Sequence, residues 1–432
     1  MTFKVGLLGL GTVGTGTAEI LLSPDGRHSL LKEIKIAACG VRSLDKTRKV
    51  QLPPEIMSDD LEAIVSDPDV DIIVELIGGL EPARSLILKA IAKGKHIVTA
   101  NKAVISRYGD EIFTAANQAG VYVFIEAAVG GGIPVIQPLK QSLGVNRISS
   151  IIGIVNGTTN YILTRMTAEG ADFAEVLADA QKLGYAEADP TADVDGLDAA
   201  DKIAILASLA FGGRIKLDQV HCEGIRGCSA ADITYADKLG FVIKLLAIAQ
   251  RQNTQSKELQ VRVHPTFLPK DHPLASINDV YNAILVAGEP LGQVMFFGPG
   301  AGAGATASAV VSDILNIVAT LKNSGNQTKQ NHPLFSCSHQ EYFTVTAIEE
   351  LVTRFYVRFL TEDSPGVIGH LGTCFGNHEV SLESIVQIGF QNKLAEIVVV
   401  THDVKEGNFR QAMAEIQALA AINSVPSIVR VL

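Results

Sequence analysis

The segment that decides the fold of the N-terminal third is Lys4–Gly14, which reads KVGLLGLGTVG. Its first residues form a short apolar run that predicts a strand, and a helical pattern follows through Leu22. Gly9 permits a tight turn, Gly11 lets the backbone approach a pyrophosphate, and Gly14 lets helix and strand pack closely. Because a helix N-terminus also offers free N–H groups, the segment predicts a dinucleotide site. A glycine-rich turn without a ligand is the alternative.

Further apolar runs follow at a spacing typical of strands that alternate with helices. The expected strands are Ile34–Cys39, Asp71–Leu76, His96–Thr99 and Val121–Glu126, and the helical stretches between them include Ala83–Ala92 and Glu111–Gln118. This order predicts an α/β fold with a doubly wound parallel sheet of the Rossmann type. The motif TANK, which ends at Lys102, follows a strand, so we expect it at the carboxyl edge of the sheet, where ligands bind.

The residue at the tip of the second strand bears on the choice of cofactor. An Asp or Glu there would accept a hydrogen bond from the ribose 2′-hydroxyl of NAD. The chain instead reads GVRS from Gly40 to Ser43, and the Arg42 guanidinium is suited to a 2′-phosphate. NADP(H) is therefore favoured over NAD(H). A solvated surface cation is the alternative explanation of Arg42.

Length and composition bound the class of protein. A chain of 432 residues with 47% hydrophobic content predicts two or three domains. The 36 basic and 46 acidic residues give a net charge of −10, which disfavours nucleic acid and anionic membranes as partners. Five cysteines without a CxxC pair favour free thiols in a reducing compartment. We expect a cytoplasmic protein that acts on small molecules.

A run of glycines follows a carboxylate in Glu126–Pro134, which reads EAAVGGGIP. The backbone carbonyls of such a run, together with the Glu126 carboxylate, suit a hard cation. Composition alone favours a hinge between domains instead.

An acidic segment, Gly184–Lys202, leads into the apolar helix expected at Ile203–Phe211; it reads GYAEADPTADVDGLDAADK. Asp198 and Lys202 are four residues apart, so on a helix they share a face. A surface ion pair would contribute little. A buried lysine would instead have a lowered pKa, which suits proton transfer to a nascent alkoxide, and the carboxylates would suit a substrate ammonium group. The residues alone leave both explanations open.

A strand is expected to run into small polar residues in GIVNGTTNY, residues 153–161. Thr158 or Thr159 is expected to cap the helix that these residues open. The same groups could bind an amino-acid carboxylate at the helix N-terminus.

Taken in order, these motifs resemble those of bacterial homoserine dehydrogenases over about residues 1–320. The matching segments are GLGTVG, TANK, EAAVGGGIP, NGTTNYIL, GYAEADPTADVDGLDAADK and GPGAGAGATASAV. The resemblance implies NAD(P)H-dependent reduction of L-aspartate 4-semialdehyde to L-homoserine in threonine, methionine and isoleucine biosynthesis. Ala303 departs from the glycine that is common at its place in the last motif, which bears only on local geometry.

The resemblance also implies roles for particular residues. Lys202 is expected to be the catalytic acid/base, with Asp198 beside it and Lys102 as a second active-site lysine. The residues expected to bind the substrate are Glu187, Asp193, Gly157 and Thr158. The residues expected to contact the cofactor are Gly9, Gly11, Thr12, Val13, Gly14, Arg42, Lys102 and Gly302. A structural sodium ion is expected at Glu126 and the carbonyls of Val129, Gly131 and Ile133.

The C-terminal part predicts a small separate domain. Its expected strands and helices are Arg354–Leu360, a helix from Val367, Ser384–Ile388, Ala395–Thr401, Asn408–Leu419 and Ser427–Val431. That order, βαββαβ, is ferredoxin-like. The stretch DSPGVIGHL resembles an ACT domain, which implies an amino-acid effector near Asn377–Ser381, with L-threonine expected. A dimerisation module without a ligand is the alternative.

The expected organisation has four parts. Residues 1–128, with 300–322 returning, form the dinucleotide-binding domain, and residues 129–299 form an α+β substrate and dimerisation domain. Residues 323–350 are a linker and 351–432 the ACT domain, in a homodimer or homotetramer. Two alternatives remain: another NADP-linked amino-acid or hydroxy-acid dehydrogenase, and a non-enzymatic amino-acid sensor, which would need no proton donor.

Overall fold

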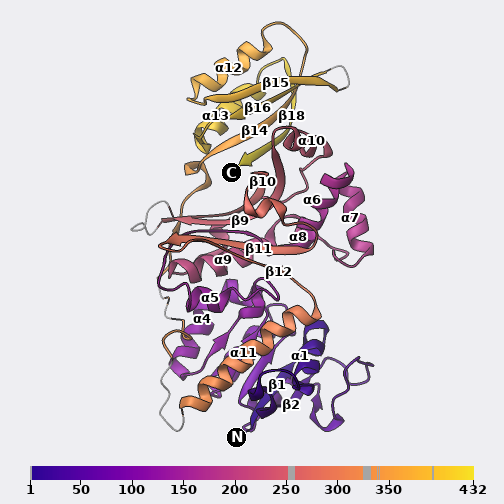
Figure 1. Cartoon of the computed structure of the whole chain (residues 1–432), viewed down its shortest axis with the longest axis vertical. Helices are drawn as coiled ribbons and strands as arrows, with labels where there is room; N and C mark the ends of the chain where they lie inside the picture. The colour runs from indigo at the N-terminus through magenta and orange to yellow at the C-terminus, as the bar shows by residue number, and fades with distance from the viewer. Residues whose placement is uncertain (1, 252–257, 325–331, 338, 340, 392–393) are drawn as a thin grey trace. The chain divides into compact units, whose positions relative to one another are not determined.

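The computed structural model describes the chain except residues 1, 252–257, 325–331, 338, 340 and 392–393 (Figure 1). The chain divides into two compact units. The first comprises Met1–Ile151, Asp201–Leu217 and Asn282–Phe343, and the second comprises Ile152–Ala200, Asp218–Tyr281 and Thr344–Leu432.

The first unit is built on a six-stranded parallel sheet. Its strands, in spatial order, are β3 (Met57–Ser58), β2 (Ile34–Gly40), β1 (Phe3–Leu8), β4 (Ile72–Glu75), β5 (His96–Thr99) and β6 (Val123–Phe124). An order of 3-2-1-4-5-6 is that of a doubly wound dinucleotide fold, with a crevice where the order reverses between β1 and β4. The predicted Rossmann-type sheet is therefore confirmed.

Helices cover this sheet, and one of them returns from late in the sequence. They are α1 (Thr12–Leu22), α2 (Leu61–Ser66), α3 (Ala83–Ala92), α4 (Lys102–Ala119), α5 (Ile136–Lys140) and α11 (Ala303–Ser324), the last following the strands β11 (Tyr281–Glu289) and β12 (Gly292–Pro299). By length and composition α11 could cross a membrane. Its side chains Val310, Ile314 and Val318 are instead fully buried in one core with Val5 and Val74, which explains its apolar composition.

The second unit joins a helical layer to a long antiparallel pair of strands. Its helices are α6 (Gly157–Glu169), α7 (Phe173–Lys182), α8 (Thr191–Val194) and α10 (Ala230–Lys238), and its strands include β8 (His221–Cys222), β9 (Phe241–Arg251), β10 (Glu258–Pro269) and β13 (Thr344–Val345). Strands β9 and β10 pair over their full length, from Leu259 opposite Arg251 to Pro269 opposite Phe241. Two elements contain a boundary between the units along the chain: β7 (Arg147–Ile154) and α9 (Leu197–Phe211).

The same unit contains the predicted βαββαβ domain. It runs through β14 (Val352–Thr361), α12 (Val367–Asn377), β15 (Leu382–Gln391), β16 (Leu394–Thr401), β17 (Val404–Lys405), α13 (Glu406–Gln417) and β18 (Ile422–Val431). Four of the strands form an antiparallel array in the order β18-β14-β16-β15. The rings of Phe355 and Phe409 stack at 3.8 Å between centroids in its core. Parallel pairing at Thr266 and Arg430 joins β18 to β10.

Several predicted boundaries were wrong. Helix α4 begins at Lys102 instead of 111, because Asn101 caps it. The predicted strand at 121–126 shortens to β6, since Glu126 enters a 3₁₀ turn. The expected linker, residues 323–350, lies partly outside the described residues, and its described part includes β13 and a 3₁₀ turn at Ile348–Glu350. All five cysteines are free thiols, as predicted, although Cys222 and Cys337 are only partly buried.

Candidate active site

The glycine turn after β1 has the geometry that a dinucleotide requires. Gly9 has a φ of +103°, and a Cβ on Gly14 would lie 2.1 Å from the carbonyl oxygen of Gly9. A Cβ on Gly11 would meet nothing within 4 Å. Gly11 is the N-cap of α1, which has no side-chain cap and no acidic residue in its first turn. The N–H groups at the start of α1 are therefore presented to open space, which fits a pyrophosphate.

The late glycine-rich segment lies beside this turn. A Cβ on Gly16 of α1 would lie 2.8 Å from the carbonyl oxygen of Ala303, so α1 and the start of α11 are in close contact. Gly302, with a φ of +114°, is exposed at the N-terminus of α11. Ala303 is exposed as well, so its Cβ is accommodated without displacing a neighbour.

Two buried polar residues fix the carboxyl ends of β4 and β5. Glu75 is fully buried, and its carboxylate accepts hydrogen bonds from two backbone N–H groups of the following turn and from Thr99 Oγ1 at 2.6 Å. Asn101 caps α4 and donates through Nδ2 to the carbonyl oxygen of Gly79 at 2.7 Å. Lys102, the first residue of α4, is thereby held at the carboxyl edge of the sheet, as predicted. Sequence analysis missed Glu75, although a carboxylate ending the apolar strand IIVE was a usable signal.

The loop after β2 carries several cations, among them Arg42 and Arg48. Arg42 is exposed directly beyond the strand tip. Arg48 donates to the backbone carbonyls of Ser43 and Lys46, the latter at 2.8 Å, and so braces the loop. Among the described residues of this edge, Arg42 is the one whose place matches the predicted contact with a 2′-phosphate.

One carboxylate ties helix α4, which begins at Lys102, to helix α9, which contains Lys202. Asp201 of α9 is buried and accepts hydrogen bonds from Ser106 Oγ at 2.7 Å and from an Arg107 nitrogen at 2.8 Å, both on α4. Lys202, the next residue, is partly exposed, which lies between the surface ion pair and the buried lysine that the sequence left open. The carboxylate that turns inward toward α4 is Asp201, a residue to which the sequence had assigned no role.

Asn156 gathers the carboxylates of the acidic segment. Its Nδ2 donates to Asp193 Oδ1 at 2.7 Å and to Asp198 Oδ2 at 2.9 Å. Its Oδ1 accepts from the N–H of Thr159 at 2.8 Å and so caps α6, which shows that the predicted threonine cap was wrong. Asn156 is buried, and a single amide therefore fixes both the start of α6 and two of the predicted site carboxylates.

The remaining predicted substrate residues lie on the same elements. Thr158 donates from Oγ1 to the carbonyl oxygen of Tyr185 at 2.7 Å. A Cβ on Gly157 would lie 2.7 Å from the carbonyl oxygen of Val280, so glycine is required by close packing there. The side chain of Glu187 is exposed beyond α7.

The predicted cation site has a different arrangement from the one expected. The carboxylate of Glu126 accepts three backbone N–H groups at the start of α5, from Val135, Ile136 and Gln137, at 2.6 to 2.8 Å. Burial raises its pKa although these bonds oppose the rise. Asp313 accepts the N–H of Glu126, and burial together with the charge of Glu126 raises the pKa of Asp313 well above its usual range.

The Glu126 carboxylate therefore caps the start of α5. Among the described residues no group of three His, Cys, Asp or Glu side chains is placed to hold a metal. Asp313 Oδ1 is buried without a hydrogen-bond partner, and such an atom favours a nearby cation or proton.

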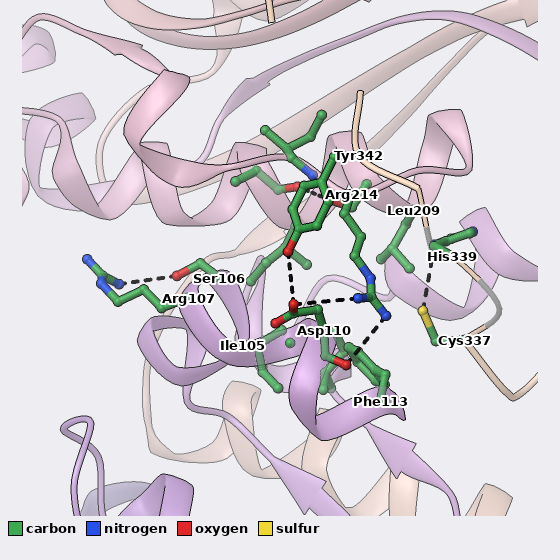
Figure 2. A pocket seen from close by; sticks show the side chains of 16 residues that line it. Ile105, Ser106, Arg107, Asp110, Phe113, Leu209, Arg214, Cys337, His339 and Tyr342 are labelled. Atoms are coloured by element: carbon green, nitrogen blue, oxygen red, sulfur yellow. Dashed lines mark hydrogen bonds and ion pairs between the residues drawn. The ribbon is translucent and has the colours of Figure 1, made fainter. Parts of the chain in front are cut away.

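A pocket that is partly open to solvent lies further along α4 and α9. Figure 2 shows its polar wall, in which Tyr342 donates to Asp110 at 3.0 Å and Arg214 lies 3.7 Å from the same carboxylate. None of the residues predicted to bind cofactor or substrate lines this pocket. The chemistry is therefore to be sought at the N-terminal ends of these helices.

Comparison with known proteins defines the class first. Residues 9–126 match the family model described as homoserine dehydrogenase, NAD binding domain, residues 134–315 match the homoserine dehydrogenase model, and residues 355–421 match the ACT domain. These domains are those of an NAD(P)-dependent oxidoreductase that acts on a CH–OH group.

Full-length relatives then give the family. The chain is 70% identical to the homoserine dehydrogenase of Synechocystis sp. over 100% of both chains, and 41% identical to that of Neisseria gonorrhoeae over 99% of this chain and 98% of the relative. A crystal structure of a homoserine dehydrogenase from Thiobacillus denitrificans covers 100% of this chain and 98% of its own, at 40% identity and a TM-score of 0.93. The chain belongs to the homoserine dehydrogenase family.

An archaeal relative extends the comparison to a bound cofactor. A hyperthermophilic archaeal homoserine dehydrogenase, whose structure was determined in complex with NADPH, matches 74% of this chain and 99% of its own at 27% identity and a TM-score of 0.62. Membership of an enzyme family removes the non-enzymatic sensor as an alternative.

Proposed function

We propose that this enzyme reduces L-aspartate 4-semialdehyde to L-homoserine with NADPH as the preferred reductant, within threonine, methionine and isoleucine biosynthesis. The observation that carries the proposal is the pairing of Asp193 and Asp198 by Asn156, with Asp198 one helical turn before Lys202. The fixed Asp193 carboxylate suits the ammonium group of an amino-acid substrate, and Lys202, with Asp198 beside it, suits a carbonyl oxygen that becomes an alcohol.

The proposed roles divide the reaction between the two ends of the substrate. The cofactor, when bound, supplies the hydride to the aldehyde carbon. Lys202 donates a proton to the oxygen, and Asp198, one helical turn away, orients the Lys202 side chain. Lys102, at the carboxyl edge of the sheet, steadies the negative charge that develops on the aldehyde oxygen. Asp193 and the exposed Glu187 attract the substrate ammonium group, beside Gly157 and Thr158.

Replacement of the proton donor tests this assignment. We expect Lys202→Ala to lower kcat by roughly a hundredfold to ten-thousandfold, the usual contribution of a positioned acid. NADPH binding, measured by fluorescence titration, stays at the wild-type value. Lys182→Ala is the matched control, because Lys182 is an exposed lysine that pairs with Asp179 at 3.0 Å on α7. Near-normal turnover by the Lys202 variant would remove Lys202 from the mechanism.

The preference for NADPH rests on Arg42 and on the lack of a carboxylate at the tip of β2. We expect Arg42→Ala to raise KM for NADPH by about tenfold, the effect of losing one charged hydrogen bond, and to leave KM for NADH unchanged. Arg27→Ala, at an exposed arginine that donates to the Ser23 carbonyl, serves as the control. An equal rise in both KM values would show that Arg42 does not bind the 2′-phosphate.

We further propose that L-threonine inhibits the enzyme through the ACT domain, at Asn377–Ser381. This segment is anchored to α13, since Asn377 and His378 both bond the Glu415 carboxylate, at 3.3 and 2.8 Å. Initial rates of NADPH oxidation with and without L-threonine test the proposal. Rates that do not respond to threonine would leave the ACT domain as a dimerisation module.

The remaining parts of the proposal concern the cation, the assembly and the compartment. A sodium ion is proposed at the carbonyls of Val129, Gly131 and Ile133 beside Glu126, in a cytoplasmic homodimer or homotetramer with the four-part organisation predicted from the sequence. Thermal unfolding in NaCl and in tetramethylammonium chloride of equal ionic strength tests the cation: a higher midpoint in sodium supports it, and equal midpoints contradict it. Light scattering measures the assembly.

A further inference from the structure

An ion pair between the buried Arg430 and the partly exposed Glu223 joins the ACT domain to a short segment that follows β8. Arg430 of β18, 4% exposed, donates two hydrogen bonds to the Glu223 carboxylate, at 2.8 and 3.0 Å. The same guanidinium donates to Glu406 of α13 at 2.6 and 2.8 Å. Burial raises the pKa of Glu223, but hydrogen bonds from His221 and Arg430 outweigh this and hold that pKa well below its ordinary value. Glu223 is therefore a charged anchor with fixed geometry.

The segment that contains this anchor, Cys222–Arg226, also holds the acidic segment of the proposed substrate site. The N–H of Ile225 donates to the carbonyl oxygen of Val194 at 2.8 Å, and Cys222 Sγ lies 3.3 Å from the carbonyl oxygen of Asp195. The Arg226 guanidinium bonds the Asp195 carboxylate.

Close packing reinforces these bonds at one position. A Cβ on Gly224 would lie 2.1 Å from the carbonyl oxygen of Val194 and 2.4 Å from Cα of Asp195. Val194 and Asp195 therefore pack directly against the Gly224 backbone, and the acidic segment has no room to move closer to it. The residue before Val194 is Asp193, whose carboxylate Asn156 holds on its other side.

We infer that Glu223 is a positioning residue for the substrate: held by Arg430, it sets the place of Asp193 and Asp198 through the segment Cys222–Arg226. This inference rests on the proposed roles of those two carboxylates, Asp193 toward the substrate ammonium group and Asp198 beside Lys202. The same contacts give the ACT domain a continuous physical connection to the substrate site, from β18 through Glu223 to the residues on either side of Asp193.

A pair of glycine substitutions tests the inference without removing a charge. We expect Gly224→Ala to push Val194 and Asp195 away, and to lower kcat/KM for L-aspartate 4-semialdehyde by up to about a hundredfold, as a misplacement of about 1 Å does. The loss appears mainly in KM for the aldehyde, while KM for NADPH stays unchanged. Gly227→Ala is the matched control, because a Cβ there meets nothing within 4 Å.

A charge series at the anchor makes the test specific. We expect Glu223→Gln to raise KM for the aldehyde by about tenfold, the equivalent of one weakened charge-assisted bond, and Glu223→Asp to recover part of that loss. NADPH binding reports on whether each variant is folded. If Glu223 has only a structural role, its replacement changes KM for both the aldehyde and NADPH, or it lowers the unfolding temperature without changing either KM.

The outcomes separate this inference from the proposed function. If the wild-type enzyme oxidises NADPH with the aldehyde, but Gly224→Ala and Glu223→Gln retain the wild-type KM, the positioning role is overturned. If the wild-type enzyme does not turn over the aldehyde at all, the proposed function fails first. A rise in aldehyde KM in both variants, absent from Gly227→Ala, supports the inference.

Discussion

Alanine at Gly11 and alanine at Gly14, both in the turn after β1, should have different effects. The first should weaken cofactor binding, and the second should destabilise the protein. Gly11 has φ −79° and ψ −154°, an extended conformation that alanine can adopt, and its Cβ would point into open space. Alanine is a poorer N-cap than glycine by a few tenths to about 1 kcal/mol, and it lowers the entropy of the unfolded chain by a similar amount. These two contributions to the free energy of unfolding nearly cancel. Gly11→Ala should therefore unfold within about 2–4 °C of the wild type.

The cost of Gly11→Ala should appear in cofactor binding. The Cβ occupies the space through which a pyrophosphate approaches the N–H groups of α1. Loss of one hydrogen bond to a charged group costs about 1.5–3 kcal/mol, which raises the Kd for NADPH by roughly ten- to a hundredfold.

Gly14→Ala should instead destabilise the protein, because its Cβ would lie 2.1 Å from the carbonyl oxygen of Gly9 and the backbone must shift. Overpacking of this kind costs about 1–3 kcal/mol. Thermal unfolding and NADPH fluorescence titration of both variants measure the contrast. A Gly11 variant that binds NADPH as tightly as the wild type, or a Gly14 variant that unfolds at the wild-type temperature, would refute this account of the turn.

Two other predictions concern the ties around the site. Asp201→Asn should lower kcat by about tenfold while the protein stays folded. The reason is that an amide weakens the hydrogen bonds from Ser106 and Arg107 that join α9 to α4. An unchanged kcat would show that these bonds do not affect Lys102 and Lys202. Burial lowers the pKa of His96 to about 4, and its Nδ1 accepts the N–H of Tyr122 at 3.0 Å. The unfolded chain takes up this proton below about pH 6.5 and the folded chain does not, so stability should fall as the pH drops from 6.5 to 4. Thermal unfolding of His96→Asn at pH 7 and pH 5 should show a smaller loss than the wild type, and an equal loss would contradict the assignment.

The parts of the fold that follow from local pattern were predictable. Strand β5 and helix α3 have the predicted bounds, because each is an apolar run or amphipathic stretch with clear ends. The βαββαβ order of the ACT domain was predicted for the same reason. The long pair β9 and β10 was not predicted, because its strands are buried over most of their length and lack a clear alternation of apolar and polar residues.

The types of residue in the candidate site were predictable from the sequence, but the hydrogen bonds that join these residues were not. The sequence singled out Asp193, Asp198 and Lys202, yet the residue that holds the first two together is Asn156, some 40 positions earlier. Asp201 was assigned no role because its partners lie on α4, about 95 residues away. Side-chain hydrogen bonds between residues this far apart in the sequence depend on tertiary packing, which local spacing does not encode.

The most direct test of the central claim is the oxidation of NADPH by the purified enzyme with L-aspartate 4-semialdehyde, followed by absorbance. We expect rapid oxidation that depends on the aldehyde, forms L-homoserine in equal amount and is lost in Lys202→Ala. Folded enzyme that binds NADPH but does not oxidise it with this aldehyde would contradict the account.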